Sequence, residues 1–117
     1  MKKLCALVLA LLSTGFMFNA AAESQIEAGK AAVTKANCAS CHGADFNSPI
    51  DPAYPKLAGQ HKDYLAHAMN SYRRDKSDAN SRSNPIMGPI AKQLSDKDIS
   101  NIAAYLHSLP GSLVLKR

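Results

Sequence analysis

Five consecutive residues of this sequence have the types and the spacing needed to hold a redox cofactor: Cys38-Ala39-Ser40-Cys41-His42. Two thiols three positions apart reach the two vinyl groups of one haem, and the histidine that follows them reaches the iron. Such an iron transfers electrons or binds small ligands. We therefore expect Cys38 and Cys41 to form thioether bonds to one haem c, and His42 to be an axial ligand of its iron.

The ligand on the opposite face of the iron decides between these two chemistries. A methionine thioether stabilises ferrous iron and suits an electron carrier, whereas an open face suits ligand binding or catalysis. Beyond residue 22 the sequence has two methionines, Met69 and Met87. Met69 falls on an apolar helical stripe, where methionine commonly fills a core. Met87 lies between Pro85 and Pro89 in an expected loop with little to pack against, so we expect Met87 to be the second axial ligand.

Three further histidines offer an alternative, in which a second imidazole binds the iron. His67 falls on the polar side of an expected helix, where solvent exposure explains it. His61 stands at the start of that helix, and His107 stands near the end of the last one, where a charged imidazole suits the helix dipole. None of the three is preferred over Met87.

The same two cysteines allow other chemistries. Cys38, Cys41, His61 and His67 are a permissible tetrahedral zinc set, but this assignment leaves Met87 and the histidine of the pentapeptide without a role. In an exported domain the two thiols could form a disulfide, which would close only a very short loop. A thioredoxin-type redox pair would need a βαβ pattern around it, and the sequence shows none. Haem attachment remains the preferred interpretation.

Helices must position these residues, and the first two have clear signals. Ser24 and Glu27 fit a capping box, which predicts a helix from Ser24 to about Ala36 that leads the chain to the cysteines. A second helix is expected from about His61 to Arg73. Its apolar residues recur at helical spacing and form one stripe: Tyr64, Leu65, Ala68, Met69 and Tyr72.

The last helix has the strongest signal. Ser95 and Asp98 again fit a capping box, and Pro110-Gly111 marks the end of the helix. Its apolar face is formed by Ile99, Ile102, Ala103 and Leu106. Residues 43–60 and 75–93 are rich in Pro, Gly, Asn and Ser, and we expect them to be irregular loops. No alternating strand pattern occurs, so the predicted fold class is all-α with three main helices and long loops around the cofactor.

The N-terminal residues predict export. Lys2 and Lys3 precede an apolar run over 4–18, and Ala20-Ala21-Ala22 provides the small residues of a cleavage site. The apolar run is short for a membrane span, which needs about 20 residues. We expect residues 1–22 to be a cleaved signal peptide and residues 23–117 to be one domain in the periplasm; an uncleaved anchor is the alternative.

The composition limits the class of partner. The chain has 14 Lys and Arg against 9 Asp and Glu, a net charge of +5, and removing Lys2 and Lys3 lowers it to +3. This charge is too small to favour nucleic acid. The local cluster Arg73-Arg74-Asp75-Lys76 with Arg82 could steer a partner, but we interpret it as a solvated helix end. A domain of this size without tryptophan has a small core, and a haem would add apolar mass to it.

With these residues identified, the sequence resembles a class I cytochrome c, closest to the bacterial c553 and c4 type. The similarity covers essentially all of residues 23–117. Its motifs occur in the order Cys38-Ala39-Ser40-Cys41-His42-Gly43, Tyr54-Pro55-Lys56-Leu57-Ala58-Gly59-Gln60, Met87, Leu94-Ser95-Asp96-Lys97-Asp98-Ile99 and Ile102-Ala103-Ala104-Tyr105-Leu106. One departure is Val33, where the family usually has an aromatic residue. The c4 proteins carry two haem domains, whereas this chain has one attachment motif.

The resemblance implies several features of structure and function. The first and last helices should cross closely at Gly29 and Tyr105, and a proline carbonyl, that of Pro55 or Pro52, should accept the Nδ1 proton of His42. The implied function is that of a monomeric, non-enzymatic periplasmic electron carrier. Its partners would be redox proteins such as a membrane-bound oxidase or reductase. The alternative is a haem enzyme or gas sensor whose sixth iron position is open or easily displaced.

Overall fold

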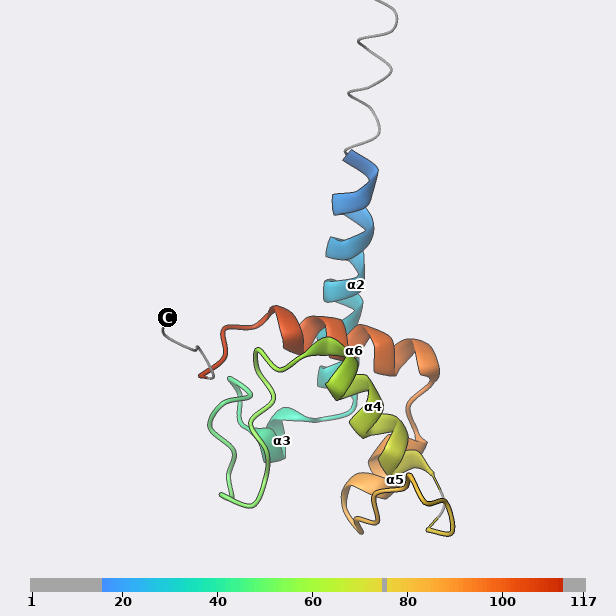
Figure 1. Ribbon diagram of the computed structural model, residues 1–117. Coiled ribbons are helices and arrows are strands. Elements are labelled where there is room, and N and C mark those ends of the chain that lie inside the picture. Colours follow the sequence, from blue (N-terminus) through green and yellow to red (C-terminus); the bar gives the residue numbers. More distant parts are fainter. Residues whose placement is uncertain (1–15, 75, 113–117) are drawn as a thin grey trace, which may run out of the picture.

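The computed structural model describes residues 16–74 and 76–112, with side chains from residue 21 onward. Within these ranges the chain is helical and has no strand, which confirms the all-α fold class. The elements are α2 (Phe16–Lys35), α3 (Ala39–His42), α4 (Lys62–Arg73), α5 (Met87–Lys92) and α6 (Asp96–Ser108) (Figure 1). The three longest, α2, α4 and α6, include the three helices that the sequence predicts.

The crossing of α2 and α6 is the most extensive contact between helices (Figure 1). At the crossing point Gly29 is buried, and a Cβ added there would lie 2.6 Å from Cβ of Tyr105 and would overlap the carbonyl oxygen of Asn101. Only glycine allows the two backbones to approach this closely. The predicted approach of Gly29 and Tyr105 is therefore confirmed.

The core lies where α2, α4 and α6 meet. Its buried members include Val33 of α2, Leu65 of α4, and Ile102 and Leu106 of α6. Val33 is only 4% exposed, so the aliphatic side chain at this position packs fully into the core. Phe46 is equally buried, and its ring meets that of Tyr105 edge-on, with ring centroids 6.2 Å apart.

The predicted start of the first helix at Ser24 is wrong. The helix α2 begins at Phe16, so Ser24 lies inside it and does not cap it. Residues 16–23 contain three consecutive alanines and neither Gly nor Pro, so nothing in them stops a helix from continuing toward the N-terminus. Most of the predicted signal peptide, residues 1–15, lies outside the described residues, and cleavage after Ala22 stays a prediction. Within the described residues, no helix has both the length and the apolar character that crossing a membrane requires.

The start of α6 is as predicted. The Ser95 hydroxyl accepts a hydrogen bond from the Asp98 backbone N–H, and the Asp98 carboxylate accepts one from the Ser95 N–H, both at 3.0 Å. Hydrogen bonds from the side chain and the backbone of Ser95 lower the pKa of Asp98. The helix ends at Ser108, shortly before Pro110.

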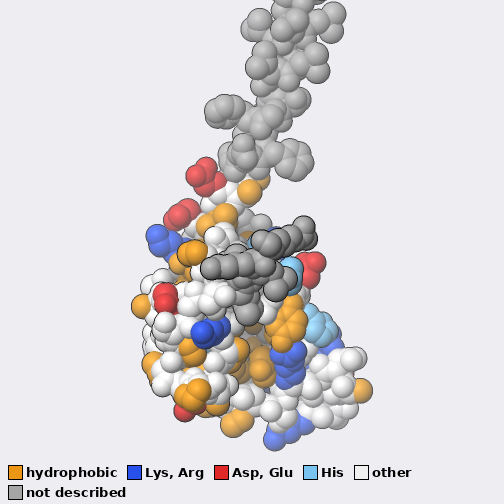
Figure 2. Space-filling view, turned by 60° about the vertical axis from the view of Figure 1, so that its left-hand side comes forward, with side chains coloured by type: hydrophobic (Ala, Val, Ile, Leu, Met, Phe, Trp, Pro, Cys, Tyr) orange, Lys and Arg blue, Asp and Glu red, His pale blue; other side chains and the backbone are white. Residues whose placement is uncertain are grey.

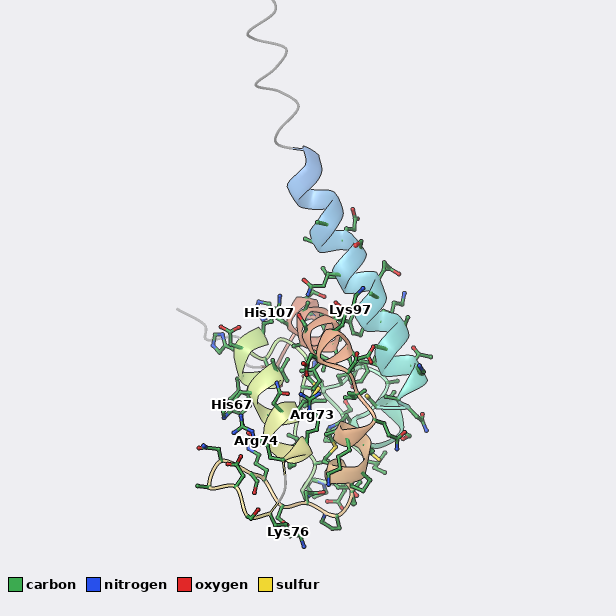
Figure 3. All side chains as sticks on the ribbon, turned by 90° about the vertical axis from the view of Figure 1, so that its right-hand side faces the viewer. His67, Arg73, Arg74, Lys76, Lys97 and His107 are labelled. Atoms are coloured by element: carbon green, nitrogen blue, oxygen red, sulfur yellow. The ribbon has the colours of Figure 1, made fainter. Side chains whose placement is uncertain are left out.

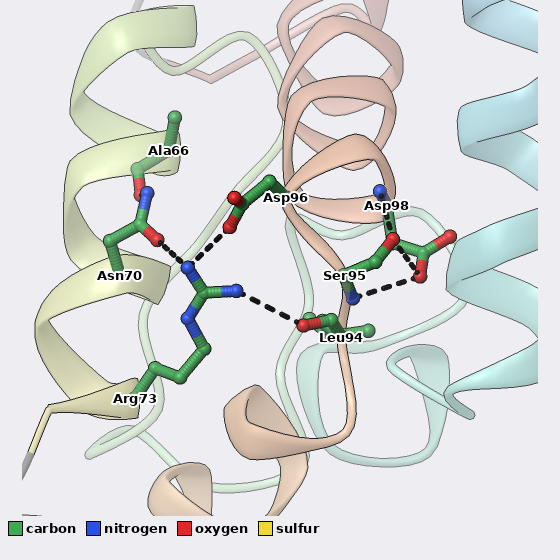
Figure 4. A network of polar contacts seen from close by, with 7 residues as sticks. All are labelled: Ala66, Asn70, Arg73, Leu94, Ser95, Asp96 and Asp98. Atoms are coloured by element: carbon green, nitrogen blue, oxygen red, sulfur yellow. Dashed lines mark hydrogen bonds and ion pairs between the residues drawn. The ribbon is translucent and has the colours of Figure 1, made fainter.

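The side chain of Arg73 joins the end of α4 to the start of α6 (Figure 4). Its guanidinium donates to the Leu94 carbonyl at 3.2 Å and to the Asn70 side chain at 2.9 Å, and it forms an ion pair with Asp96. This residue of the basic cluster therefore has a structural role. Its neighbour Arg74 is exposed, as expected for a solvated helix end (Figure 3).

We expect Gly29→Ala to destabilise the haem-loaded protein by about 1–3 kcal/mol, because the added methyl group overpacks the crossing of α2 and α6. The free energy of unfolding from denaturant titration measures the effect. The matched control is Gly88→Ala, whose Cβ would have only the Tyr72 carbonyl oxygen nearby, at 3.8 Å. Equal stability of the two variants would contradict the proposed role of the crossing.

Candidate haem-binding site

A cavity of about 550 Å³ lies between α3, the loop at residues 53–57 and helices α4, α5 and α6. Its volume falls within the range of about 300–1,000 Å³ that is usual for cofactor pockets. Four predicted site residues line it: Cys38, Cys41, His42 and Met87. The fold thus brings the attachment motif and Met87, which are far apart in the sequence, to the same cavity.

A left-handed residue turns the chain from α2 into the attachment motif. Asn37, two residues beyond the end of α2, has φ of 54°, and its N–H donates to the Thr34 carbonyl at 3.1 Å. Asparagine tolerates this conformation better than most residues do. The next residues begin the four-residue helix α3, in which the His42 N–H donates to the Cys38 carbonyl at 3.0 Å. One helical turn therefore places Cys38, Cys41 and His42 on one wall of the cavity.

Cys38 and Cys41 are not joined by a disulfide, and both are half-buried. Burial raises the pKa of the Cys38 thiol, with a smaller contribution from the neighbouring Cys41 in the same direction. Within the described residues, no group of three or more His, Cys, Asp or Glu side chains could hold a metal ion. The alternative zinc set of two cysteines with His61 and His67 is therefore not assembled.

The imidazole of His42 is fixed by a single hydrogen bond. The side chain is 7% exposed, and Nδ1 donates to the Pro55 carbonyl at 2.9 Å. A carbonyl oxygen can only accept, so in the neutral ring the proton is on Nδ1 and Nε2 keeps its lone pair. Such a bond orients a metal-binding histidine and raises its basicity. The sequence left open whether the carbonyl of Pro55 or that of Pro52 accepts this bond, and the structure shows that it is Pro55.

Met87 is not in a loop as predicted, because it is the first residue of the short helix α5. The side-chain oxygen of Asn84 accepts hydrogen bonds from the N–H groups of Ile86 and Met87, at 2.9 and 2.8 Å. Pro89 lies in the first turn of α5, where a missing N–H costs nothing. The dipeptide Asn84-Pro85 is a typical helix-starting pair, and it is the signal that our sequence analysis missed.

The apolar stripe of α4 faces the cavity. All five of its predicted members contribute to the wall: Tyr64, Leu65, Ala68, Met69 and Tyr72. Met69 also packs against the hydrophobic core, to which Met87 does not belong. Both methionines thus line the cavity, but of the two only Met69 also packs against the hydrophobic core.

The three other histidines do not line the cavity. His61, His67 and His107 are exposed, and Figure 3 shows His67 on the outer side of α4. The Nδ1 of His107 donates to the Gln60 carbonyl at 2.9 Å, which ties the end of α6 to the loop before α4. Among the described histidines, His42 alone is placed to bind an iron in this cavity.

The residues present fit a haem. The walls are mostly apolar side chains, and two cations, Lys56 and Arg82, also line the cavity. On the face drawn in Figure 2, apolar and basic side chains likewise lie next to each other. Arg82 is half-buried, so our assignment of it to a solvated helix end does not hold. The sequence offered no local signal for this position.

A family model and several known proteins match this chain. A family model described as "Cytochrome c" matches residues 26–110. "Cytochrome c4" of Pseudomonas aeruginosa is 41% identical over 107 residues, which is 92% of this chain and 48% of that protein. "Cytochrome c6" of a Picosynechococcus strain is 38% identical over 109 residues, 91% of this chain and 92% of that protein.

Another relative is the "Thiosulfate dehydrogenase electron acceptor" of Stutzerimonas stutzeri, 40% identical over 73 residues, which is 62% of this chain and 32% of that protein. The chain spans about half the length or less of this relative and of the cytochrome c4 proteins that it matches.

We expect Asn84→Ala to destabilise the protein by about 0.5–2 kcal/mol, because two N–H groups at the start of α5 lose their acceptor. Asn84→Asp keeps an acceptor oxygen and should stay close to the parent. Thermal unfolding followed by helical circular dichroism measures both. Identical midpoints for Ala and Asp would show that Asn84 does not start α5.

Proposed function

Because this chain belongs to the cytochrome c family and its single attachment motif carries one covalent haem c, we propose that it transfers single electrons between redox proteins of the periplasm. The observation that carries the proposal is the presence of two thiols, one imidazole and one thioether around a single, mostly apolar cavity. The haem supplies the electron chemistry when bound, and the protein supplies ligands, orientation and exclusion of water.

We assign the roles within the site as follows. Cys38 and Cys41 hold the haem covalently, His42 binds the iron through Nε2, and Met87 binds it through sulfur. The bond to Pro55 prepares His42 for this role by fixing its ring and its proton. Met87 is preferred over Met69 because Met69 already packs against the core, whereas the backbone of Met87 is held in place by Asn84.

The proposal extends to location and partners. Residues 1–22 would be removed on export, leaving residues 23–117 as one monomeric domain in the periplasm. Donors and acceptors would be redox proteins, such as a membrane-bound oxidase or reductase. One relative is by its name an electron acceptor for a dehydrogenase, so a dehydrogenase is a class of donor to test. Docking should be weak and fast, because transient redox encounters use small interfaces.

An enzyme or gas sensor would need an accessible sixth iron position and groups to activate a bound ligand. Within the described residues no second histidine lines the cavity. The relatives named above are cytochromes and an electron acceptor. No observation therefore favours this alternative over the electron carrier.

We expect Met87→Ala to lose the weak sulfur–ferric absorption band at the red edge of the oxidised spectrum and to bind cyanide or carbon monoxide rapidly. The identity of the axial ligands sets the reduction potential of a haem over a range of roughly 0.8 V. The potential of this variant should fall by a sizeable part of that range. Met69→Ala is the matched control and should keep the band while losing stability. Retention of the native spectrum in both variants would rule out this ligand assignment.

Replacement of both cysteines, Cys38→Ala with Cys41→Ala, should abolish covalent attachment of haem. The parent protein, matured in a host that installs haem c, should have a mass equal to the polypeptide plus one haem, and the double variant the mass of the polypeptide alone. Haem that stays with the double variant through denaturing electrophoresis would contradict the proposed attachment.

A further inference from the structure

The segment that carries Met87 is attached to the last turn of α4 on both of its sides. Before Met87, the backbone N–H of Arg82 donates to the Ser71 carbonyl at 2.9 Å. After Met87, Nη1 of Arg73 donates to the Leu94 carbonyl at 3.2 Å. Both attachment points on α4 lie in its last turn. The position of the segment beside the cavity therefore depends on this one turn of helix.

The attachment through Leu94 continues into α5. The N–H of Leu94 donates to the carbonyl of the buried residue Ala91 at 3.2 Å, and Leu94 itself lines the cavity. At the other end of α5, a Cβ added to Gly88 would lie 3.8 Å from the Tyr72 carbonyl oxygen, so the first turn of α5 runs beside α4. A helix of 6 residues has little stability of its own, so these contacts fix where α5 lies.

The guanidinium of Arg73 makes three polar contacts at once (Figure 4). Besides the bond to Leu94, it donates to the Asn70 side chain at 2.9 Å and forms the ion pair with Asp96. The Asp96 side chain is 87% exposed, and an ion pair with so exposed a carboxylate contributes little to stability. The bond to the Leu94 carbonyl is therefore the contact that matters for the Met87 segment. A guanidinium has five N–H donors in fixed directions, whereas a lysine ammonium acts as a point charge.

We propose that Arg73 is a positioning residue that keeps the Met87 sulfur on the iron by tying the chain beyond α5 to α4. The proposal rests on the haem and the Met87 ligation of the proposed function, and it gives control of the sixth iron position to a residue that does not line the cavity.

The effect on ligand binding follows from local opening. An external ligand can bind the sixth iron position only while the sulfur is away from it, and so only while the Met87 segment is locally open. Loss of a hydrogen bond that is made in the closed state alone raises the population of the open state. The bond from Arg73 to Leu94 thus favours an electron carrier over a ligand-binding protein.

The test is the rate at which cyanide binds to the haem-loaded, ferric protein. We expect Arg73→Gln to bind cyanide about tenfold faster than the parent, because a hydrogen bond from a charged donor changes an equilibrium by about that factor or more. The sulfur–ferric band should remain, since the closed state still predominates. Arg73→Lys keeps the charge but not the planar group, and it should bind cyanide about threefold faster than the parent.

Two control variants separate this role from charge and from general stability. Arg74→Gln removes the same charge from the exposed neighbouring position and should change the rate less than about twofold (Figure 3). Val33→Ala leaves a void in the core at a position that does not line the cavity. It should lower the free energy of unfolding and yet change the rate of cyanide binding less than about twofold.

Each outcome decides the proposal. Equal rates for Arg73→Gln and Arg74→Gln would overturn it, and so would a rise in Val33→Ala as large as that in Arg73→Gln. If Arg73→Gln does not retain haem, Arg73→Lys decides, and a parent-like rate in that variant would overturn the proposal. Failure of the proposed function is distinguishable, because it would appear in the unsubstituted protein as missing covalent haem or a missing sulfur–ferric band.

Discussion

The close contact of α2 and α6 at Gly29 is the constraint on which the site depends. It fixes the position in space of the C-terminal end of α2 relative to α6. It therefore also fixes the point at which Asn37 turns the chain into the Cys-x-x-Cys-His motif. The same helix α6 contributes Ile102 and Leu106 to the wall of the cavity. A shift at this crossing would therefore move the cysteines relative to the opposite wall. Glycine is required there for the geometry of the site as much as for packing.

The cavity also explains the apolar residues of α4. Such a stripe usually packs against protein, but here it borders a space of about 550 Å³. Part of the apolar surface that would pack into the core of an ordinary domain therefore lines a ligand cavity in this one. Anything that binds the folded state and not the unfolded one stabilises the fold. We infer that the haem is a structural part of this small domain as well as its redox centre.

Local signals predicted the parts of this structure that depend on neighbouring residues. The capping box at Ser95 and the attachment motif are each contained within a few residues, and both were found. Among long-range features, the approach of Gly29 and Tyr105 was expected from the family resemblance, but two others were not predicted. Spacing alone did not decide between Pro55 and Pro52, because the choice depends on how the loop folds back onto His42. The position of the Arg82 side chain depends on contacts with the rings of Tyr64 and Tyr72 in α4, which no local pattern reveals.

The unexpected length of α2 is compatible with removal of residues 1–22. Among the described side chains of α2, the first to bond another helix is Gln25, which donates to Ser100 and accepts from Lys62. Residues 21–24 are exposed. A domain that begins at residue 23 would therefore keep these interhelix bonds. Ser24 would then lie at the start of α2, where its predicted capping box with Glu27 becomes possible. Acidic side chains in that first turn would also suit the helix dipole.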